Sequence, residues 1–393
     1  MDAAAPPAPA TLDWPATSGW LACAGALEAA PTPAVVLDLD VARRNIARAA
    51  GLAREHGVAL RPHVKTHKSL RLAALQRDAG AAGFTAAKPS EAAVFLHAGL
   101  PVTVAYPVLR PEAVRMLLDA AGEGEVRFVV DSMPGLHALS GEAQRLGRTV
   151  PAYMELDVGL RRCGMAPDSP GALALATALA RAPGVRFLGL LSHAGHAYAA
   201  RGPAEVRAIA AAERAAVAGF ADRLQRLGIP VPERSVGSTP TVLLHDGFAG
   251  LTEARPGNYV FMDLIQVSLG VARPADVALQ VLATVVSANA AWAIVDAGSK
   301  VLSSDGAPHG AGTVQGHGLA IPLRGGGARP VVRLSEEHGF VAQDPANPLP
   351  VGARVRIVPN HACPVANLAD ACLAVDGTGA TDHWPVDARG AVQ

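Results

Sequence analysis

The most constraining feature of the chain is a regular alternation of short β-branched runs with long alanine-rich segments. The runs have the composition of strands, and the segments between them, such as PAEVRAIAAAERAAVAGFADRLQRLG, have the pattern of helices. This is the spacing of successive βαβ units, and about eight of them fit a closed (β/α)₈ barrel. A doubly wound open sheet is the alternative, but no GxGxxG motif follows the first expected strand. The expected strands begin near Val35, Val58, Phe84, Val102, Val126, Ala152, Val185 and Ser235.

The pattern changes after about residue 265. Long helices stop, and VALQVLATVVS, WAIVDAG, PVVRLSE and ARVRIVPN have the composition of strands joined by Gly/Pro loops. A chain of 393 residues is also expected to form more than one domain. We therefore predict three parts: an N-terminal arm over residues 1–31 that packs on the β domain, an α/β barrel over residues 32–265, and a C-terminal, mostly β domain over residues 266–393.

The charge balance argues against two classes of partner. The chain carries 34 basic and 34 acidic side chains, so no net charge indicates a nucleic-acid or membrane partner. Residues 278–295 contain no charged side chain and approach the length of a membrane span. Polar residues interrupt this stretch, however, and β-branched clusters on either side of SANA predict two strands joined by a turn. We therefore expect a soluble protein.

Cysteine usage and the first residues indicate a reducing compartment. The four cysteines form no CxxC pair and lack the density of a secreted disulfide-rich domain, so free thiols are expected. The first basic residue is Arg43, so the N-terminus lacks the charged start of a signal peptide. These features predict a cytoplasmic protein.

A lysine among histidines, in the run VALRPHVKTHK, is the first candidate for chemistry. The run begins as a strand, and Lys65 falls at its C-terminal end, where barrels place their active sites. Desolvation and repulsion from nearby cations such as Lys68 or Arg61 would favour the neutral amine. A neutral amine can form an imine with an aldehyde. The alternative is an ordinary surface lysine in a basic loop.

Two loops late in the barrel region have the composition of an anion site. SVGSTPT, residues 235–241, lies at the expected last strand, and its small and hydroxyl residues leave backbone N–H groups for a phosphate. Barrel phosphate sites favour the loops after the final strands, although an ordinary Gly/Ser turn has the same composition. RPGNYVFMD, residues 255–263, follows closely, and the Tyr259 hydroxyl could bind the same anion.

Further polar groups follow expected strands in ELDVGLRRCGM and LSHAGHAY. Arg162 could contact a ring oxygen of a cofactor, and His193, His196 and Tyr198 could line its face. Each of them alone is an ordinary loop residue. Only their convergence would make a site.

A His-x-Cys pair, His361 and Cys363, lies in PNHACPVANLAD just after an expected strand. If the segment is extended, side chains at i and i+2 project to one side and can reach one metal ion. A thiolate with an imidazole favours zinc over magnesium or calcium. With only two protein ligands evident, positions remain for water or substrate, which is typical of a catalytic metal. The alternative is a buried cysteine beside a capping histidine.

Together, these strings resemble the fold-type III pyridoxal-phosphate enzymes, in the branch that contains D-threonine aldolases and eukaryotic-type D-serine dehydratases. The likeness extends from TPAVVLDLDVARRNI to HACPVANL and so covers nearly the whole chain. PHVKTHK, SVGSTPT, RPGNYVF and IVDAGSK in this fixed order make the combination specific. The resemblance implies an alanine-racemase-like (β/α)₈ barrel with a C-terminal β domain, acting as a homodimer.

The resemblance also implies roles for particular residues. Lys65 becomes the Schiff-base lysine of pyridoxal 5'-phosphate, and His361 and Cys363 become the ligands of a divalent metal, for which we expect Zn²⁺. The other candidate cofactor contacts are Arg162, His193 and Tyr198 near the ring, and Gly237, Ser238, Thr239, Gly257, Asn258 and Tyr259 near the phosphate.

The branches of this family divide at the metal pair. Aldolases of the group carry His-x-Asp and the dehydratases His-x-Cys, so Cys363 and the string HAGHAY indicate a dehydratase. One departure is Leu191, where dehydratases tend to have a tyrosine. The predicted reaction is β-elimination from a D-3-hydroxy amino acid such as D-serine, which yields a 2-oxo acid and ammonia.

Other activities stay open. A D-threonine-type aldolase would use the same residues to release glycine and an aldehyde. Racemisation is less expected, because alanine racemases take a second base from a C-terminal-domain tyrosine and no tyrosine follows Tyr259. A non-catalytic protein of pyridoxal-phosphate homeostasis is the alternative outside enzymes, but such proteins lack a second domain.

Overall fold

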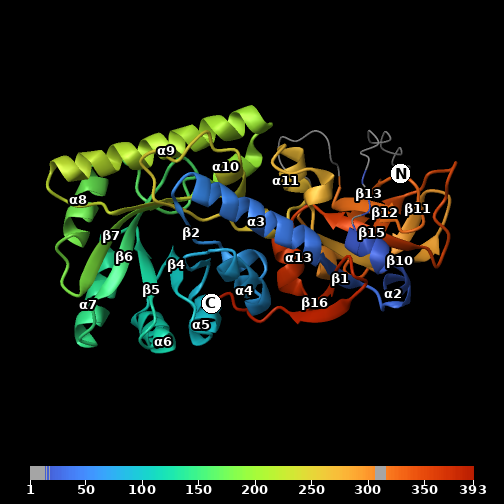
Figure 1. Cartoon of the computed structure of the whole chain (residues 1–393), viewed down its shortest axis with the longest axis horizontal. Coiled ribbons are helices and arrows are strands. Elements are labelled where there is room, and N and C mark those ends of the chain that lie inside the picture. The colour runs from blue at the N-terminus through green and yellow to red at the C-terminus, as the bar shows by residue number, and fades with distance from the viewer. Residues whose placement is uncertain (1–13, 15, 17, 306–315) are drawn as a thin grey trace. The chain divides into compact units, whose positions relative to one another are not determined.

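The computed structural model describes residues 14, 16, 18–305 and 316–393. The chain divides into two compact units (Figure 1). The barrel unit contains Ala47–Ala197, Ala204–Gly257 and Gly390–Gln393. The β unit contains the N-terminal residues to Ile46, with Tyr198–Pro203 and Asn258–Arg389. The exact bounds of the three parts that the sequence suggests stay a prediction.

An eight-stranded parallel sheet forms the centre of the barrel unit. Each strand pairs in parallel with its neighbours in the order β2-β9-β8-β7-β6-β5-β4-β3. A parallel bridge from His63 to Thr85 joins the segment after β2 to β3, at the other end of this order. The predicted α/β barrel is therefore confirmed. Its strands are β2 (Ala59–Leu60), β3 (Phe84–Ala86), β4 (Val102–Pro107), β5 (Val126–Val130), β6 (Val150–Leu156), β7 (Val185–Ser192), β8 (Glu233–Val236) and β9 (Glu253–Ala254).

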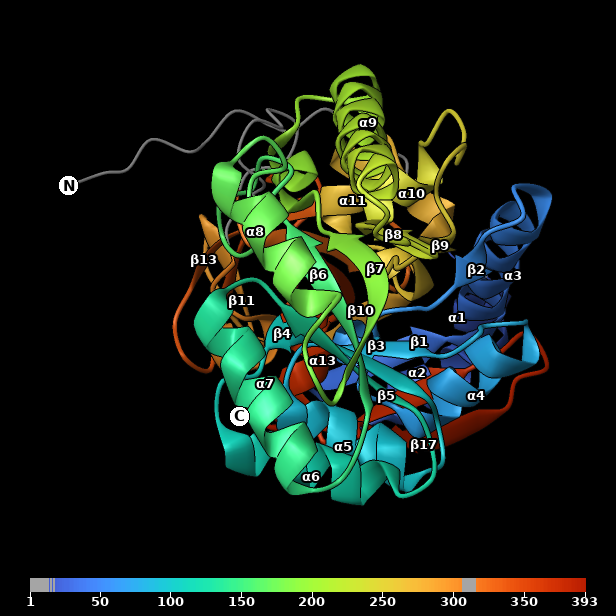
Figure 2. The same cartoon turned by 90° about the vertical axis from the view of Figure 1, so that its left-hand side faces the viewer.

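Helices follow the barrel strands and cover the outside of the sheet, as Figure 2 shows for α5 to α8. In α6 the buried residues Ala113, Val114, Leu117 and Leu118 form a single apolar stripe, the pattern of a helix that covers a sheet. Proline occupies the first helical positions of α5 to α8, where its missing N–H is tolerated. The helices here are α3 (Leu39–Glu55), α4 (Leu70–Asp78), α5 (Pro89–His97), α6 (Pro111–Ala121), α7 (Met133–Arg145), α8 (Pro170–Leu179), α9 (Pro203–Arg226) and α10 (Thr239–Leu243), with the 3₁₀ turns η1 (Val64–Thr66) and η2 (Gly195–Ala199).

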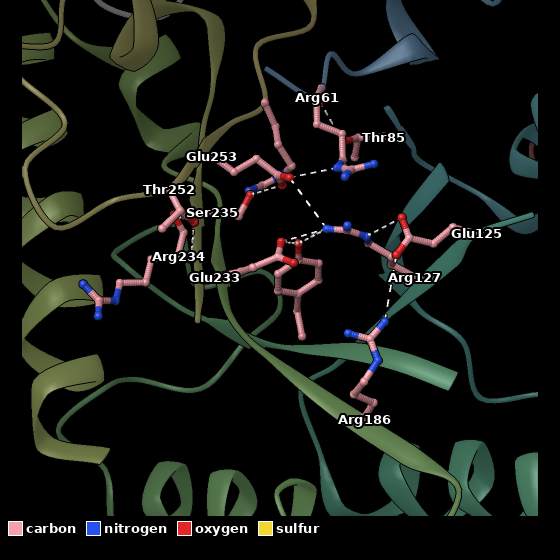
Figure 3. Close-up of polar contacts among 12 residues, drawn as sticks. Arg61, Thr85, Glu125, Arg127, Arg186, Glu233, Arg234, Ser235, Thr252 and Glu253 are labelled. Carbon is pink, nitrogen blue, oxygen red and sulfur yellow. Dashed lines mark hydrogen bonds and ion pairs between the residues drawn. The ribbon is translucent and has the colours of Figure 1, made fainter. Parts of the chain in front are cut away.

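A charged layer lies inside the barrel near the start of the strands (Figure 3). Arg61 Nε contacts Glu253 Oε2 at 2.8 Å, and both side chains are almost fully buried. Arg127 Nη1 contacts Glu233 Oε2 at 2.7 Å, and the Tyr153 hydroxyl bonds to the same carboxylate. Each buried charge thus has a partner of opposite sign, as burial requires.

The prediction that the strand near Val35 starts the barrel is wrong. This strand, β1 (Ala34–Asp38), pairs with β10 and β16 in the other sheet. The eighth barrel strand is instead β9, which consists of only Glu253 and Ala254. An apolar run such as AVVLD fits the centre of either sheet, because its composition reports burial and not its pairing partner.

The β unit contains a nine-stranded sheet in the order β11-β14-β13-β12-β15-β10-β1-β16-β17. An additional pairing of β11 with β10 closes the first six of these strands into an antiparallel barrel. The predicted hairpin around SANA is confirmed as β10 and β11. The strands are β10 (Leu279–Ala288), β11 (Trp292–Val295), β12 (Gly318–Pro322), β13 (Arg329–Leu334), β14 (Gly339–Ala342), β15 (Arg354–Pro359), β16 (Ala371–Val375) and β17 (Thr381–Pro385).

Short helices cover this sheet and connect its strands. Trp20 and Leu27 from the first two helices, and Cys23 between these helices, pack with Val36 and Leu282 in one buried cluster. Within the described ranges, no helix has the length and apolar content needed to cross a bilayer. The helices are α1 (Ser18–Ala22), α2 (Ala24–Ala29), α11 (Leu264–Ser268), α12 (Ser299–Leu302) and α13 (Ala362–Leu368), with η3 (Asn258–Val260) and η4 (Pro274–Asp276).

Candidate active site

Lys65 lies directly after β2, in the turn η1, at the carboxyl end of the parallel strands. The backbone N–H of Lys65 donates to His63 Nδ1 at 3.4 Å, and the His63 N–H donates to the Pro256 carbonyl at 2.9 Å. The Lys65 residue is partly buried. The predicted location at the functional face of the barrel is therefore found.

The two cations expected to repel Lys65 are paired with carboxylates. Lys68 Nζ contacts Glu91 Oε1 at 3.1 Å and donates to the Ala391 carbonyl at 3.0 Å. Arg61 contacts Glu253 in the charged layer. Positive charge near Lys65 therefore has to come from other residues.

Two partly buried histidines reveal the source of this charge. Burial, together with Lys65, Arg162 and Arg255, lowers the pKa of His193 to about 3 against the opposing effect of its hydrogen bond to Gly237. Burial and the same three cations hold the pKa of His63 well below its ordinary value. Both imidazoles are therefore neutral at pH 7. The predicted residues Lys65, Arg162 and His193 are thus close enough to act on one another electrostatically.

Arg255 belongs to this group, and sequence reasoning missed it as a site residue. Its guanidinium is buried and donates to Ser235 Oγ and to the Ser192 carbonyl. Burial lowers the pKa of Arg255, while Glu253 and other acidic groups oppose that effect. Arg255 directly follows β9, and a residue that follows a barrel strand is a candidate for the site. This strand has only two residues, however, so the sequence does not reveal it.

Two carboxyl groups near the strand ends complete the electrostatic picture of the barrel unit. Burial raises the pKa of Glu155 to about 7, against the opposing effect of Arg162 and Arg255. Glu213 is fully buried and accepts hydrogen bonds from Ser192 Oγ at 2.7 Å and from the Gly237 N–H at 3.4 Å. Neither carboxyl group was singled out from the sequence.

The two predicted anion loops contact each other. The Gly257 N–H donates to Thr239 Oγ1 at 3.2 Å, which joins the second loop to the first. A Cβ at Gly257 would lie 3.0 Å from Thr66 Oγ1, directly beside the Lys65 turn. Gly237 has φ +153°, and a Cβ there would lie 2.9 Å from the backbone nitrogen of Arg255. Both glycines therefore permit a close approach of neighbouring atoms that a side chain would prevent.

The first loop ends in the helix α10. Ser238 caps this helix through Thr241, and the Ser238 N–H donates in return to Thr241 Oγ1 at 3.2 Å. Gly237, Ser238 and Thr239 thus form a tight turn at the start of α10. The Gly237 and Ser238 N–H groups already donate, at 3.4 and 3.2 Å, to Glu213 Oε1 and Thr241 Oγ1, so a phosphate held by this turn would replace these contacts.

Three predicted cofactor contacts belong to the β unit. Asn258 and Tyr259 form η3 and are buried, and the Asn258 side-chain amide donates to Asp263 Oδ2. Tyr198 lies in η2 and is partly buried.

His361 and Cys363 lie where β15 gives way to α13. The expected extended segment holds only in part, since His361 is extended but the helix begins at Ala362. His361 Nδ1 lies 2.7 Å from Asp305 Oδ2, and about one third of its side chain is exposed. Burial lowers the pKa of His361, but Cys363, Asp263 and Asp305 outweigh it and raise the pKa to about 10.

The surroundings of His361 therefore favour a positive charge at this position. A divalent cation bound by the imidazole and the thiolate would supply that charge. Asp305 was not predicted, because it precedes His361 by a long stretch of chain. No group of three or more His, Cys, Asp or Glu side chains is gathered for a metal within residues 18–305 and 316–393.

Comparison with known proteins places the chain in a family. Residues 37–264 match the family described as alanine racemase, N-terminal domain. Residues 278–375 match the putative serine dehydratase domain. The first match alone covers more than half of the chain.

Relatives of known activity match along nearly the whole chain. D-threo-3-hydroxyaspartate dehydratase of Delftia sp. (strain HT23) is 38% identical, over 90% of this chain and 96% of its own. D-threonine aldolase of Arthrobacter sp. is 31% identical, over 91% and 93%. D-serine dehydratase of Dictyostelium discoideum is 27% identical, over 84% and 90%.

Solved structures show the same fold. The Delftia dehydratase has a TM-score of 0.84 at 36% identity, over 91% of this chain and 98% of its own. D-threonine aldolase from Filomicrobium marinum has a TM-score of 0.82 at 33% identity, over 93% and 98%. The dehydratase is also known as variants in which a histidine, or a cysteine two positions after it, is replaced by alanine, the cysteine variant in a metal-free form.

These matches agree with the two-unit fold described above. The chain belongs to the alanine-racemase-like, fold-type III pyridoxal-phosphate enzymes and is a lyase of the branch that contains D-serine dehydratase, D-threonine aldolase and hydroxyaspartate dehydratase.

Proposed function

We propose that the protein catalyses a pyridoxal-phosphate- and zinc-dependent β-elimination from a D-3-hydroxy amino acid such as D-serine, which yields a 2-oxo acid and ammonia. The observation that carries the proposal is the His361–Cys363 pair at the start of α13, surrounded by anionic groups. The spacing of this pair equals that of the histidine and cysteine replaced in the dehydratase variants, one of which is metal-free.

The residues of the barrel unit would hold the cofactor. Lys65 would carry its aldehyde, and the turn at Gly237, Ser238 and Thr239 would bind its phosphate with the help of Gly257. In the β unit, Asn258 would offer its backbone N–H, since its side-chain amide is committed to Asp263. The remaining proposed contacts are Arg162, His193, Tyr198 and Tyr259.

Pyridoxal phosphate, when bound, supplies an acceptor for the electron pair that remains as the Cα proton leaves. The Lys65 amine takes up this proton as the general base. His193 stays neutral and donates its Nδ1–H to the Gly237 carbonyl at 2.6 Å. Arg162 and Arg255 supply positive charge on the same side and oppose charge on any imidazole there.

A zinc ion held by His361 and Cys363 would supply Lewis-acid chemistry toward the β-hydroxyl, because hydroxide is a poor leaving group. Asp305 accepts at His361 Nδ1 and thereby orients the ring, leaving Nε2 for a metal. The side chains of the pair hold and orient the ion.

A second activity is favoured by a specific observation, the similarity to D-threonine aldolases at 31% and 33% identity. An aldolase would deprotonate the β-hydroxyl and break the Cα–Cβ bond with the same residues. D-threonine separates the two activities, since a dehydratase yields 2-oxobutanoate and an aldolase yields glycine and acetaldehyde.

The test is a panel of D- and L-3-hydroxy amino acids, including serine, threonine and 3-hydroxyaspartate, with 2-oxo acids and aldehydes detected in parallel. We expect 2-oxo acid from D-substrates only, with activity lost on chelation and restored by Zn²⁺. Lys65→Ala should abolish both turnover and the visible absorbance of bound cofactor. Aldehyde as the main product would overturn the elimination. Bound cofactor without metal or turnover would favour a carrier protein.

We also propose that the protein acts as a homodimer. Size-exclusion chromatography with light scattering should give a molar mass of twice the chain mass of 40.1 kDa. A monomer that is fully active would contradict this part of the proposal.

A further inference from the structure

Asp263 connects two segments that the proposed function uses for different purposes. It lies in the β unit, between η3, which contains the proposed phosphate contacts, and α11. Its side chain is fully buried. No role was predicted for it from the sequence, and the proposed reaction assigns it none.

The carboxylate of Asp263 accepts three hydrogen bonds. Oδ2 accepts from the Asn258 side-chain amide and from the Ala362 backbone N–H, the latter at 3.0 Å. Oδ1 accepts from the Gln266 N–H at 3.1 Å and so caps α11. One oxygen atom therefore joins Asn258 directly to the residue that lies between His361 and Cys363.

A second contact runs beside the first. The Ile265 N–H donates to the Asn360 carbonyl at 3.2 Å, so α11 is also bound to the residue before His361. Asn360 is buried, and its side-chain amide donates to the Asp305 carbonyl at 3.2 Å and to the Gly316 carbonyl at 2.8 Å. The backbone around the metal pair is thus fixed from both sides.

The backbone between Asn258 and Asp263 is constrained, so that a movement of Asp263 also moves η3. The Met262 N–H donates to the Asn258 carbonyl at 2.8 Å, and Met262 adopts φ +53°, a left-handed conformation unusual for methionine. A displacement of Asp263 is therefore passed to η3 through the backbone as well as through the side chain of Asn258. Hydrogen bonds to a buried carboxylate are charge-assisted and stronger than neutral ones.

We propose that Asp263 is a positioning residue that couples the metal segment, residues 361–363, to the cofactor segment, residues 258–260, so that metal binding raises the affinity for pyridoxal phosphate. The inference rests on the proposed function, since it takes both ligands from it. By linkage, the cofactor raises the affinity for the metal by the same factor.

The experiment measures the dissociation constant of pyridoxal phosphate by its visible absorbance, in chelated protein and with saturating Zn²⁺. In the unaltered protein we expect zinc to tighten cofactor binding by about five-fold or more, within the usual range of coupling between sites. Asp263→Asn should reduce this ratio to within about two-fold of unity, because one amide cannot accept all three hydrogen bonds. It should also weaken zinc binding by about 10-fold or more, the usual effect of losing an outer-shell partner.

A matched control separates coupling from stability. Asp38 is fully buried in the same unit and accepts from the Asp40 and Val41 N–H groups at 3.1 and 3.0 Å, but touches neither segment through these bonds. Asp38→Asn should destabilise the fold to a similar extent yet keep the ratio of the cofactor dissociation constants measured without and with zinc.

Asn258→Ala provides a milder test, since it removes the hydrogen bond from Asn258 to Asp263 and keeps the one from the Ala362 N–H. It should lower the zinc-dependent ratio of cofactor dissociation constants, with little loss of zinc affinity, because the backbone contact between Met262 and Asn258 remains.

The possible outcomes distinguish this inference from the proposed function. Failure of the unaltered protein to bind either ligand would overturn both. If both ligands bind but zinc leaves the dissociation constant of the cofactor unchanged, the coupling alone is overturned. The same holds if the effect of zinc is as large in Asp263→Asn and in Asn258→Ala as in the unaltered protein.

Discussion

At the scale of single residues, the barrel site is a place where burial and positive charge act on the same groups. His63 and His193 are kept neutral by both effects, whereas in Glu155 the two effects oppose each other and burial prevails. Arg162 and Arg255 are the sources of charge in each case. The protonation states in this site are therefore set by where β6, β7 and β9 end.

The first prediction concerns Glu155. Its folded-state pKa of about 7 lies above the ordinary value of 4.5, so the native state binds more protons than the unfolded state between these values. The contribution of Glu155 to the free energy of unfolding is therefore fully present below pH 4.5. It is lost as the pH rises through about 7, by up to roughly 3 kcal/mol. In cofactor-free Glu155→Gln this loss should be absent. Urea unfolding at several pH values measures it.

The exposed Glu112→Gln, in the first turn of α6, is the control for that measurement and should keep the loss of stability that the unaltered protein shows between pH 4.5 and about 7. A difference between Glu155→Gln and the unaltered protein that stays constant from pH 4.5 to pH 8 would contradict the prediction.

At the scale of elements, the charged layer of Figure 3 ties together strands that are far apart in the sequence. Arg61 follows β2, and its partner Glu253 lies in β9, the neighbouring strand in the sheet. Ser235 Oγ donates to the other oxygen of Glu253 at 2.6 Å, which adds β8 to the same contact. The two shortest strand pairings of the barrel are thus supported by side chains.

The second prediction is a double-mutant cycle on this pair. Glu253→Leu leaves Arg61 buried without its carboxylate and should cost about 3–5 kcal/mol in the free energy of unfolding. Arg61→Met together with Glu253→Leu should recover a large part of that loss, since no unpaired charge remains. Denaturant unfolding of the four proteins gives the coupling. Additive losses would show that the pair contributes no mutual stabilisation.

Elements also show where sequence analysis succeeds and where it fails. The strands β3 to β8 were predicted because each is an apolar run between helical segments, and periodicity reports burial. β9 was missed because two residues carry no period, and with it the role of Arg255 was missed. Lys65 and the pair His361 and Cys363 were found because unusual residue types follow strands. Asp263 and Asp305 were not found, because ordinary carboxylates acquire meaning only through neighbours that are remote in the chain.

At the scale of the whole molecule, the β unit is assembled from both ends of the chain. β1 lies between β10 and β16, antiparallel to the first and parallel to the second. Its residues Val36 and Leu37 are completely or almost completely buried. The C-terminal half of the chain therefore does not contain its own complete sheet.

The third prediction follows from this arrangement. A fragment of residues 266–393 should lack cooperative unfolding, since β10 and β16 would each expose an unpaired edge. Residues 18–46 joined through a flexible linker to residues 258–389 should restore a cooperative transition in circular dichroism. Cooperative unfolding of the fragment alone would show that β1 is dispensable.

The position of β1 also has a consequence for synthesis on the ribosome. The strand emerges early, but β10 and β16 are translated only after the whole segment from Ala47 to Gly257. At ordinary translation rates of roughly 5–20 residues per second, an apolar nascent strand waits on the order of ten seconds or more for its first partner. During that interval the apolar segment AVVLD lacks both of its sheet partners, and the turn around His361 emerges later still, after β15.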